Sequence, residues 1–144
     1  MRIAISTGGG DAPGLNAVIR AAALSASSRG WDVLGICRGY YGLLGEDDIL
    51  PLTRESVRGI SHVGGTILRT TNRSNPFAFP VKQPDGSYLE IDRSQEVLDN
   101  IERLGINAII TASAPRCARA IVLGGISPLS SSPRVRTGPE VRNR

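Results

Sequence analysis

The segment with the strongest chemical character covers residues 6–20, STGGGDAPGLNAVIR. Three successive glycines and an acid follow a short β-rich run, and an apolar segment with helical spacing begins after Gly14. A glycine-rich turn between a strand and a helix exposes backbone N–H groups at the helix N-terminus, where the helix dipole favours an anion. Glycine has no side chain, so a phosphate can approach the backbone closely. The segment therefore predicts a phosphate-binding loop, and the alternative is a tight turn that only packs helix against strand.

Two well-known glycine loops do not fit this segment. A dinucleotide-binding fingerprint G-x-G-x-x-G that starts at Gly8 would need a sixth-position glycine, where the chain has Pro13. A P-loop that starts at Gly9 would need Lys followed by Ser or Thr at positions 15 and 16, which hold Leu and Asn. Both patterns are excluded.

Strands and helices alternate on either side of this loop. The first half predicts a strand at Ile3–Ser6, a helix with an apolar face that ends near Gly30, and a strand at Trp31–Cys37. The apolar face consists of Leu15, Val18, Ile19 and Ala22. Strand, helix and strand in succession imply parallel pairing with right-handed crossovers, so the expected fold is α/β with a three-layer parallel sheet.

The second half repeats this order. Asp92 and Gln95 have the spacing of a capping box, and the helix that they begin should end at Gly105. Its apolar face consists of Val97, Leu98, Ile101 and Leu104, and the next strand is predicted at residues 106–110. Between the halves, residues 79–91 predict a surface hairpin that turns around Asp85-Gly86 and adds nothing to the core.

Length and composition limit the class of protein. The chain has 144 residues, which is the length of a single domain. Hydrophobic residues make up 40% of it and charged residues 21%, and no apolar run is long enough to span a membrane. The apolar stretch at its N-terminus is too short for a signal peptide. Cys37 and Cys117 have neither metal-binding spacing nor a disulfide framework, so we expect incidental thiols in a cytoplasmic protein.

The basic residues are concentrated in the tail. Residues 1–111 carry 11 Lys and Arg against 12 Asp and Glu, whereas residues 112–144 carry 6 against 1. The tail is rich in Arg, Pro, Ser and Gly, has no aromatic residue, and shows no periodicity beyond AIVLGG. We expect it to be poorly ordered. Contact with nucleic acid through these arginines is a weaker alternative, because no aromatic side chain is available for stacking on bases, and such contact would weaken steeply with salt.

The stretch GGDAPGLNAVIR resembles, almost letter for letter, the N-terminal signature of the phosphofructokinases. The resemblance continues through GICRGYYGLL, through GGTIL with RTTNRSNPF, and through LDNIERLGINAII, and it covers residues 1–111 in order. It implies the N-terminal lobe of that family and transfer of a phosphoryl group from ATP or pyrophosphate to fructose 6-phosphate in glycolysis. It also implies Mg²⁺ as cofactor and a homo-oligomer, without nucleic acid or membrane as partner.

The resemblance assigns roles to particular residues. Gly9 and Gly10 correspond to the glycines whose backbone approaches the donor phosphates, and Asp11 to the acid that fixes the loop. Tyr40 corresponds to a tyrosine beside the nucleotide, although a packing role is equally open. Arg73 corresponds to the phosphate-side arginine, one residue late, and a solvated loop charge is its alternative.

Two further positions depart from the family pattern. Arg69 replaces a glycine that usually follows the leucine of GGTIL. Arg20 corresponds to an effector-binding arginine of allosteric bacterial members, but Leu24 replaces its partner arginine, which argues against that form of control. His62 corresponds to no catalytic residue of the family, and we expect an exposed loop histidine.

Several parts of the family's catalytic machinery have no counterpart. The Gly-Gly-Asp-Gly stretch that positions Mg²⁺, the Asp-rich stretch with the general base, and the arginines that bind the sugar phosphate do not follow residue 111. No catalytic or metal-binding residue is therefore assigned. We hypothesise that the resemblance ends near Thr111 because the reading frame changes there, and that the chain is a truncated, inactive phosphofructokinase. The alternative is a non-catalytic nucleotide-binding module.

Overall fold

The computed structural model describes residues 1–9, 12–45, 48–114 and 119–122. Within these residues the main sheet has five strands, in the spatial order β3-β2-β1-β6-β7. They are β1 (Arg2–Gly9), β2 (Asp32–Ile36), β3 (Ile49–Pro51), β6 (Ala108–Ala114) and β7 (Arg119–Val122). The pair β4 (Phe79–Lys82) and β5 (Tyr88–Ile91) forms a smaller sheet of its own.

The centre of the main sheet is parallel, as predicted. Ile3 of β1 lies opposite Val33 of β2 on one side and opposite Ala108 of β6 on the other, and both pairings are parallel. The two edge strands, β3 and β7, are antiparallel to their neighbours, which the sequence did not predict. For β7 the reason is chain length, because only four residues separate it from β6 and a parallel return needs a dozen or more.

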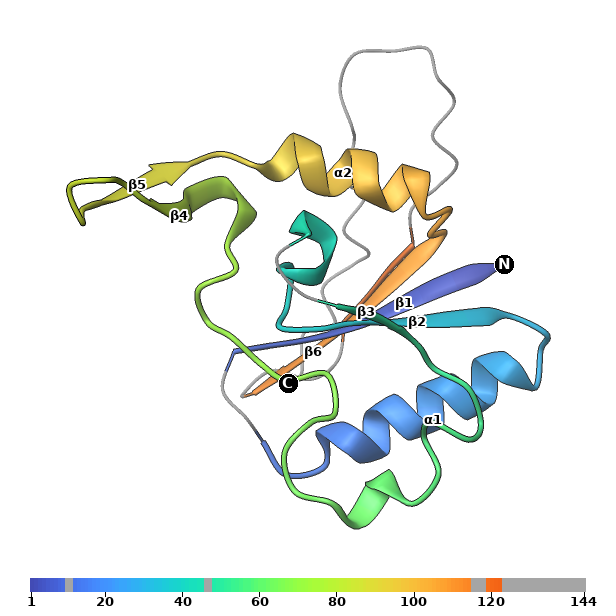
Figure 1. The fold of residues 1–144 in the computed structure, drawn as a ribbon. Coiled ribbons are helices and arrows are strands. Elements are labelled where there is room, and N and C mark those ends of the chain that lie inside the picture. Colours follow the sequence, from blue (N-terminus) through green and yellow to red (C-terminus); the bar gives the residue numbers. More distant parts are fainter. Residues whose placement is uncertain (10–11, 46–47, 115–118, 123–144) are drawn as a thin grey trace, which may run out of the picture.

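Two helices cover opposite faces of the sheet, which gives the predicted three layers (Figure 1). Alternate residues of β1 point to opposite faces. Ile3 and Ile5 therefore pack in the core beneath α1 (Leu15–Ser27), whereas Ala4 packs in the core beneath α2 (Ser94–Arg103). Gly8 and Gly9 form the carboxyl end of this central strand.

The buried face of α1 agrees only in part with the predicted one, because Leu15 and Ile19 are buried but Ala22 is half-buried and Val18 is exposed. Leu15, Ile19, Ala23 and Ala26 are buried, at spacings of three or four residues. Val18, which we assigned to this face, is 37% exposed. The helix ends at Ser27, a few residues before the glycine that the sequence suggested as its stop.

The predicted capping box of α2 does not form. The carboxylate of Asp92 accepts the backbone N–H of Ser94 at 2.8 Å, whereas the Gln95 amide donates to Asp99 at 2.9 Å and not back toward Asp92. The physical reason is that Arg93 occupies the capping position, so Asp92 lies one residue too early for the reciprocal bond. Two residues of the predicted apolar face, Val97 and Ile101, are fully buried.

The predicted hairpin is present and extends away from the main sheet (Figure 1). Gly86 in its turn has a φ of 85°, and the N–H of Gln83 donates to the carbonyl of Ser87 at 2.8 Å. Every residue of β5 is exposed. Phe79 corrects the expectation of a hairpin without core contacts, because it is buried and the Arg93 guanidinium lies 4.8 Å from its ring centroid.

Some residues after Thr111 belong to the main sheet. β6 continues to Ala114, and β7 pairs with it over Arg119–Val122. Cys117 and residues 127–144 lie outside the described residues. In the part of the chain that the structure describes, no helix has the length and apolar character to cross a bilayer.

Candidate functional site

The carboxyl ends of β1 and β6 meet the loop after β2 around a cavity of about 380 Å³. The lining residues come from four segments of the chain: Ser6, Gly8, Gly9, Gly39, Tyr40, Thr71, Asn72, Ser74, Asn75, Thr111 and Ala112. Ligand sites in open α/β sheets lie at this edge, so the cavity is where the glycine segment was expected to act. It brings together Gly9 and Tyr40, two of the residues that we singled out.

The glycines at the end of β1 have different surroundings. Gly9 has a φ of 77°, and its N–H donates to the carbonyl of Thr71 at 3.1 Å. A side chain at Gly8 would meet no atom within 4 Å, and its backbone does not require glycine. The open surface at the end of the strand is therefore at Gly8, whereas the Gly9 amide is occupied within the protein. Gly10 and Asp11 lie outside the described residues.

Two buried hydroxyl groups precede these glycines and bind different loops. Ser6 donates to the carbonyl of Gly39 at 3.2 Å, and Thr7 donates to the carbonyl of Arg69 at 2.8 Å. Because successive residues of a strand point to opposite faces, the two bonds hold one loop on each side of the sheet. Together they fix the two walls of the cavity relative to β1.

Tyr40 follows a glycine that its surroundings require. Gly39 has a φ of 64°, and a Cβ there would overlap the hydroxyl of Ser74, which is itself buried. Tyr40 is half-buried beside them and lines the cavity. Burial raises the pKa of the Tyr40 phenol above its ordinary value.

The arginines that we singled out lie outside the lining of the cavity. Arg73 is exposed; its N–H donates to Thr71 Oγ1 at 3.1 Å and its carbonyl accepts the Tyr41 hydroxyl at 3.5 Å. Arg69 has a φ of 56°, a left-handed conformation that favours glycine. This geometry agrees with the position at which the resemblance predicts a glycine.

The N-terminus of α1 follows the glycine segment. The first turn of α1 contains no acidic residue, so no side chain of its own offsets the positive end of the helix dipole. The Asn16 side chain is buried, accepts the N–H of Ile67 at 2.8 Å and donates to the carbonyl of Val63 at 3.0 Å. Arg20 is half-buried further along α1, and His62 is exposed in η2 (Ile60–His62), as expected.

The described lining does not fit a magnesium ion held by protein ligands. It offers hydroxyl, amide and backbone groups but no carboxylate. Among the described residues, no three or more His, Cys, Asp or Glu side chains gather in a possible metal site. The chemical character of the cavity is therefore that of neutral hydrogen-bonding groups around bare backbone.

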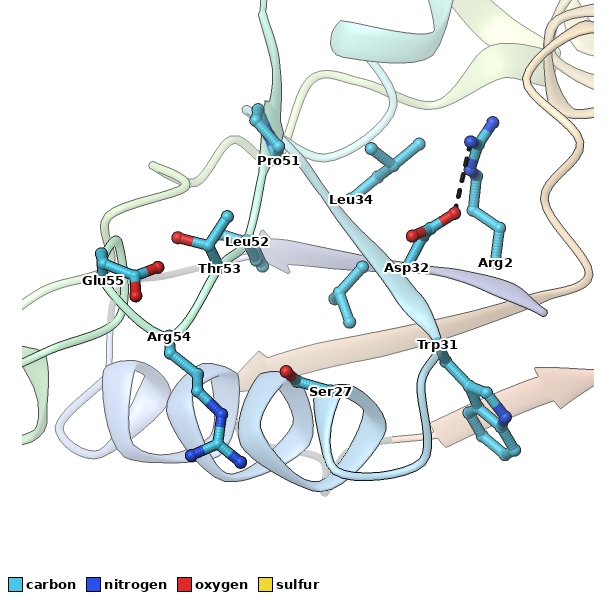
Figure 2. A pocket seen from close by; sticks show the side chains of 11 residues that line it. Arg2, Ser27, Trp31, Asp32, Leu34, Pro51, Leu52, Thr53, Arg54 and Glu55 are labelled. Atoms are coloured by element: carbon cyan, nitrogen blue, oxygen red, sulfur yellow. Dashed lines mark hydrogen bonds and ion pairs between the residues drawn. The ribbon is translucent and has the colours of Figure 1, made fainter.

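A larger hollow of about 480 Å³ lies at the amino ends of β1 and β2 (Figure 2). Arg2 and Asp32 form an ion pair there at 3.4 Å, and Arg54 and Glu55 come from the segment after β3. Because both signs of charge line it in similar number, it lacks the positive potential that would concentrate a polyphosphate. The cavity beside Gly8 is accordingly the better candidate.

Sequence reasoning missed the residues that fix this cavity. The sequence analysis places Ser6 at the end of the first strand, Thr7 in the glycine-rich segment and Asn16 where a P-loop would need Ser or Thr, and it gives none of them a role in the cavity. One sequence signal could have pointed to these residues. Polar side chains within an apolar strand or helix are costly to bury, so their hydroxyl and amide groups must form hydrogen bonds. Which partners they find depends on loops more than thirty residues away in sequence.

Comparison with known proteins shows consistent similarity to one family. The sequence model described as "Phosphofructokinase" matches residues 2–113. An ATP-dependent 6-phosphofructokinase of Chloroflexus aggregans is 48% identical over 110 residues, which are 76% of this chain and 30% of that protein. The phosphofructokinase structure from Saccharomyces cerevisiae superposes with a TM-score of 0.60 at 32% identity, covering 76% of this chain and 13% of that one.

A second relative extends the similarity into the tail. The ATP-dependent 6-phosphofructokinase 2 of Clostridium perfringens is 39% identical over 132 residues, which are 91% of this chain and 33% of that protein. An alignment of that length includes residues beyond Thr111, where we expected the resemblance to end. The chain spans about a third of the length of the curated relatives it matches.

Proposed function

Because the chain belongs to the phosphofructokinase family, we propose that the cavity at the carboxyl ends of β1 and β6 binds the phosphates of a phosphoryl donor. One observation carries the proposal: the bare backbone of Gly8 faces this cavity with room for a ligand beside it. The N-terminus of α1, whose first turn holds no acidic residue and which follows the same loop, offers a favourable potential for an anion.

We propose ATP as the donor and fructose 6-phosphate as the acceptor. Relatives named ATP-dependent 6-phosphofructokinase support this choice. In this proposal Gly9 and Gly10 let the phosphates approach, Asp11 fixes the loop, and Tyr40 lies beside the nucleotide. Arg73 adds positive charge near the donor phosphates from the rim, where it is exposed.

The family relationship also underlies our proposals for cofactor, assembly and location. A magnesium ion bound with the donor would neutralise phosphate charge during phosphoryl transfer. The described lining residues include no carboxylate that could hold this ion. We propose a cytoplasmic protein whose subunits form a homo-oligomer.

We further propose that this chain binds the donor without phosphorylating the sugar. The described residues of the cavity include no carboxylate that could accept the proton of the sugar hydroxyl. Loss of general base catalysis costs about 10²- to 10⁴-fold, and loss of acceptor positioning costs several further powers of ten. The chain then acts as a nucleotide-binding module, which is the second candidate function.

Calorimetric titration with ATP and with inorganic tripolyphosphate tests the donor site. The variant Gly8→Asp places a carboxylate in the open space beside the cavity, and Gly64→Asp makes the same change at an exposed glycine that also has open space. We expect the wild type to bind both ligands, Gly8→Asp to bind about 10-fold or more weakly, and Gly64→Asp to bind like the wild type. Equal binding by all three proteins would overturn the proposed site.

A coupled assay for fructose 1,6-bisphosphate separates the two functions. We expect no turnover by the wild type above that of Gly8→Asp with either ATP or pyrophosphate. Turnover that disappears in Gly8→Asp would show that the chain is a complete catalyst and would overturn the proposal of binding alone.

A further inference from the structure

Thr7 has a hydroxyl group that is buried within an apolar core. The residue is fully buried and packs on the same face of β1 as Ile3 and Ile5. Its hydroxyl donates to the carbonyl of Arg69 at 2.8 Å and lies 3.4 Å from the hydroxyl of Thr66. Because an unbonded hydroxyl is unfavourable in such surroundings, the bond to Arg69 is strongly maintained.

The residue that accepts this bond has an unfavourable backbone conformation. Arg69 has a φ of 56°, which residues with a side chain rarely adopt. Its own N–H donates to the carbonyl of Thr66 at 3.1 Å, so residues 66–69 form a tight turn. Local strain of this kind persists only where the surrounding structure holds it. The Thr7 hydroxyl is a buried group that holds this turn at its left-handed residue.

The turn directs the chain into the wall of the cavity. Two residues after Arg69, the carbonyl of Thr71 accepts the N–H of Gly9, and Asn72 and Ser74 then line the cavity. A change in the turn would therefore move the wall that faces the glycine segment.

We propose that Thr7 is a positioning residue for the donor-phosphate site, because its hydroxyl holds Arg69 in the left-handed conformation that places residues 71–75 against Gly9. The inference rests on the proposed function of the cavity. A purely structural Thr7 would affect stability alone, whereas a positioning Thr7 affects phosphate binding in the folded protein. The effect should also depend on which residue stands at position 69.

A cycle of variants tests this dependence. The proteins are the wild type, Thr7→Ser, Thr7→Val, Arg69→Gly and the double variant that combines Thr7→Val with Arg69→Gly. The readout is the affinity for tripolyphosphate at a temperature at which each is folded. Valine has the shape of threonine without the hydroxyl, so we expect Thr7→Val to weaken binding about 10-fold. Thr7→Ser keeps the donor and should bind within about twofold of the wild type.

Glycine at position 69 provides the decisive comparison. Glycine adopts the left-handed conformation without help, so the turn no longer needs the Thr7 hydroxyl. We expect Thr7→Val to weaken binding by less than about threefold when position 69 is glycine. Arg38→Gly is the matched control, because Arg38 is also a left-handed arginine, with a φ of 48°, and does not accept the Thr7 bond. Thr7→Val should keep its full effect in the Arg38→Gly background.

Each outcome bears on the proposal. Absence of tripolyphosphate binding by the wild type would overturn the proposed function and this inference with it. Binding by the wild type that Thr7→Val leaves unchanged would overturn this inference alone, as would an equal loss with arginine and with glycine at position 69. If Thr7→Val does not fold by itself, the double variant must still bind within about threefold of Arg69→Gly, and a larger loss contradicts the proposal.

Discussion

The backbone N–H of Gly9 donates a hydrogen bond to the carbonyl oxygen of Thr71 at 3.1 Å. The bond joins the end of the central strand to a loop more than sixty residues later in the chain. It also means that the Gly9 amide already has an acceptor. The Gly9 N–H is therefore not available to a phosphate, although Gly8 and Gly9, which both line the cavity, leave room for one to approach this end of the strand.

Hydrogen exchange tests this arrangement. The Gly9 amide should exchange slowly in the protein without ligand, because it is hydrogen-bonded at the end of a buried strand. NMR-detected exchange resolves this single amide, with the N–H of exposed Gly64 as a reference for rapid exchange. Exchange of Gly9 as fast as that of Gly64 would contradict the bond to Thr71.

The left-handed conformation of Arg69 predicts an unusual order of stabilities. Arg69→Val should lower the free energy of unfolding by roughly 1–2 kcal/mol, because a β-branched residue is poorly tolerated at positive φ. Arg69→Gly should stay within about 1 kcal/mol of the wild type, since relief of strain offsets the greater freedom of the unfolded chain. Urea denaturation measures both values, and a less stable glycine variant than valine variant would show that residue 69 is not held left-handed.

The sequence predicted the framework of the fold because its signals are local. The apolar run of Ile3–Ser6 and the helical spacing that starts at Leu15 identified the first parallel unit, which the register of β1 with β2 confirms. The capping box predicted for α2 is wrong, because the helix begins one residue later than the box requires and spacing alone does not determine that shift. The antiparallel edge strands depend on the lengths of connections that carry no periodic signal.

The sequence predicted where the cavity lies but not which hydrogen bonds hold its loops in place. Gly9 and Tyr40 were singled out from the sequence, and both line one cavity. The bonds from Ser6 to Gly39 and from Thr7 to Arg69 join residues more than thirty positions apart. No pattern within a single segment could pair those particular donors and carbonyls.

The contact between Gly39 and Ser74 predicts a large cost for a small substitution. Gly39→Ala should destabilise the protein by roughly 2–4 kcal/mol, because it combines a left-handed alanine with overlap against the Ser74 hydroxyl. Gly45→Ala is the control: Gly45 has a φ of 73° but open space around it, so the expected cost is about 1 kcal/mol. Thermal or urea unfolding measures the free energy of unfolding of both variants. An equal decrease for the two would contradict the close packing at Gly39.

Burial of Tyr40 predicts that its phenol ionises at an unusually high pH. Burial raises the pKa of this phenol, so in the folded protein it should lose its proton at a pH above the ordinary pKa of tyrosine. Because the folded protein keeps this proton where the unfolded chain loses it, the associated stability is fully present below about pH 10 and declines as the pH rises further.

Absorbance near the phenolate band, measured during a titration with base, follows this step. Tyr40→Phe should remove the phase of the titration that occurs at this raised pH. A late phase that persists in Tyr40→Phe would show that the buried phenol belongs to another tyrosine.

The location of a bound polyphosphate tests the central claim most directly. We would titrate the ¹⁵N-labelled wild-type chain with tripolyphosphate and map the changes in amide chemical shift onto the sequence. The account predicts that the largest changes fall on residues 6–9, 39–40 and 71–75, around the cavity at the carboxyl ends of β1 and β6. Changes that instead fall on Trp31, Asp32 and residues 52–55, around the hollow at the opposite ends of the strands, or no change at saturating ligand, would contradict it.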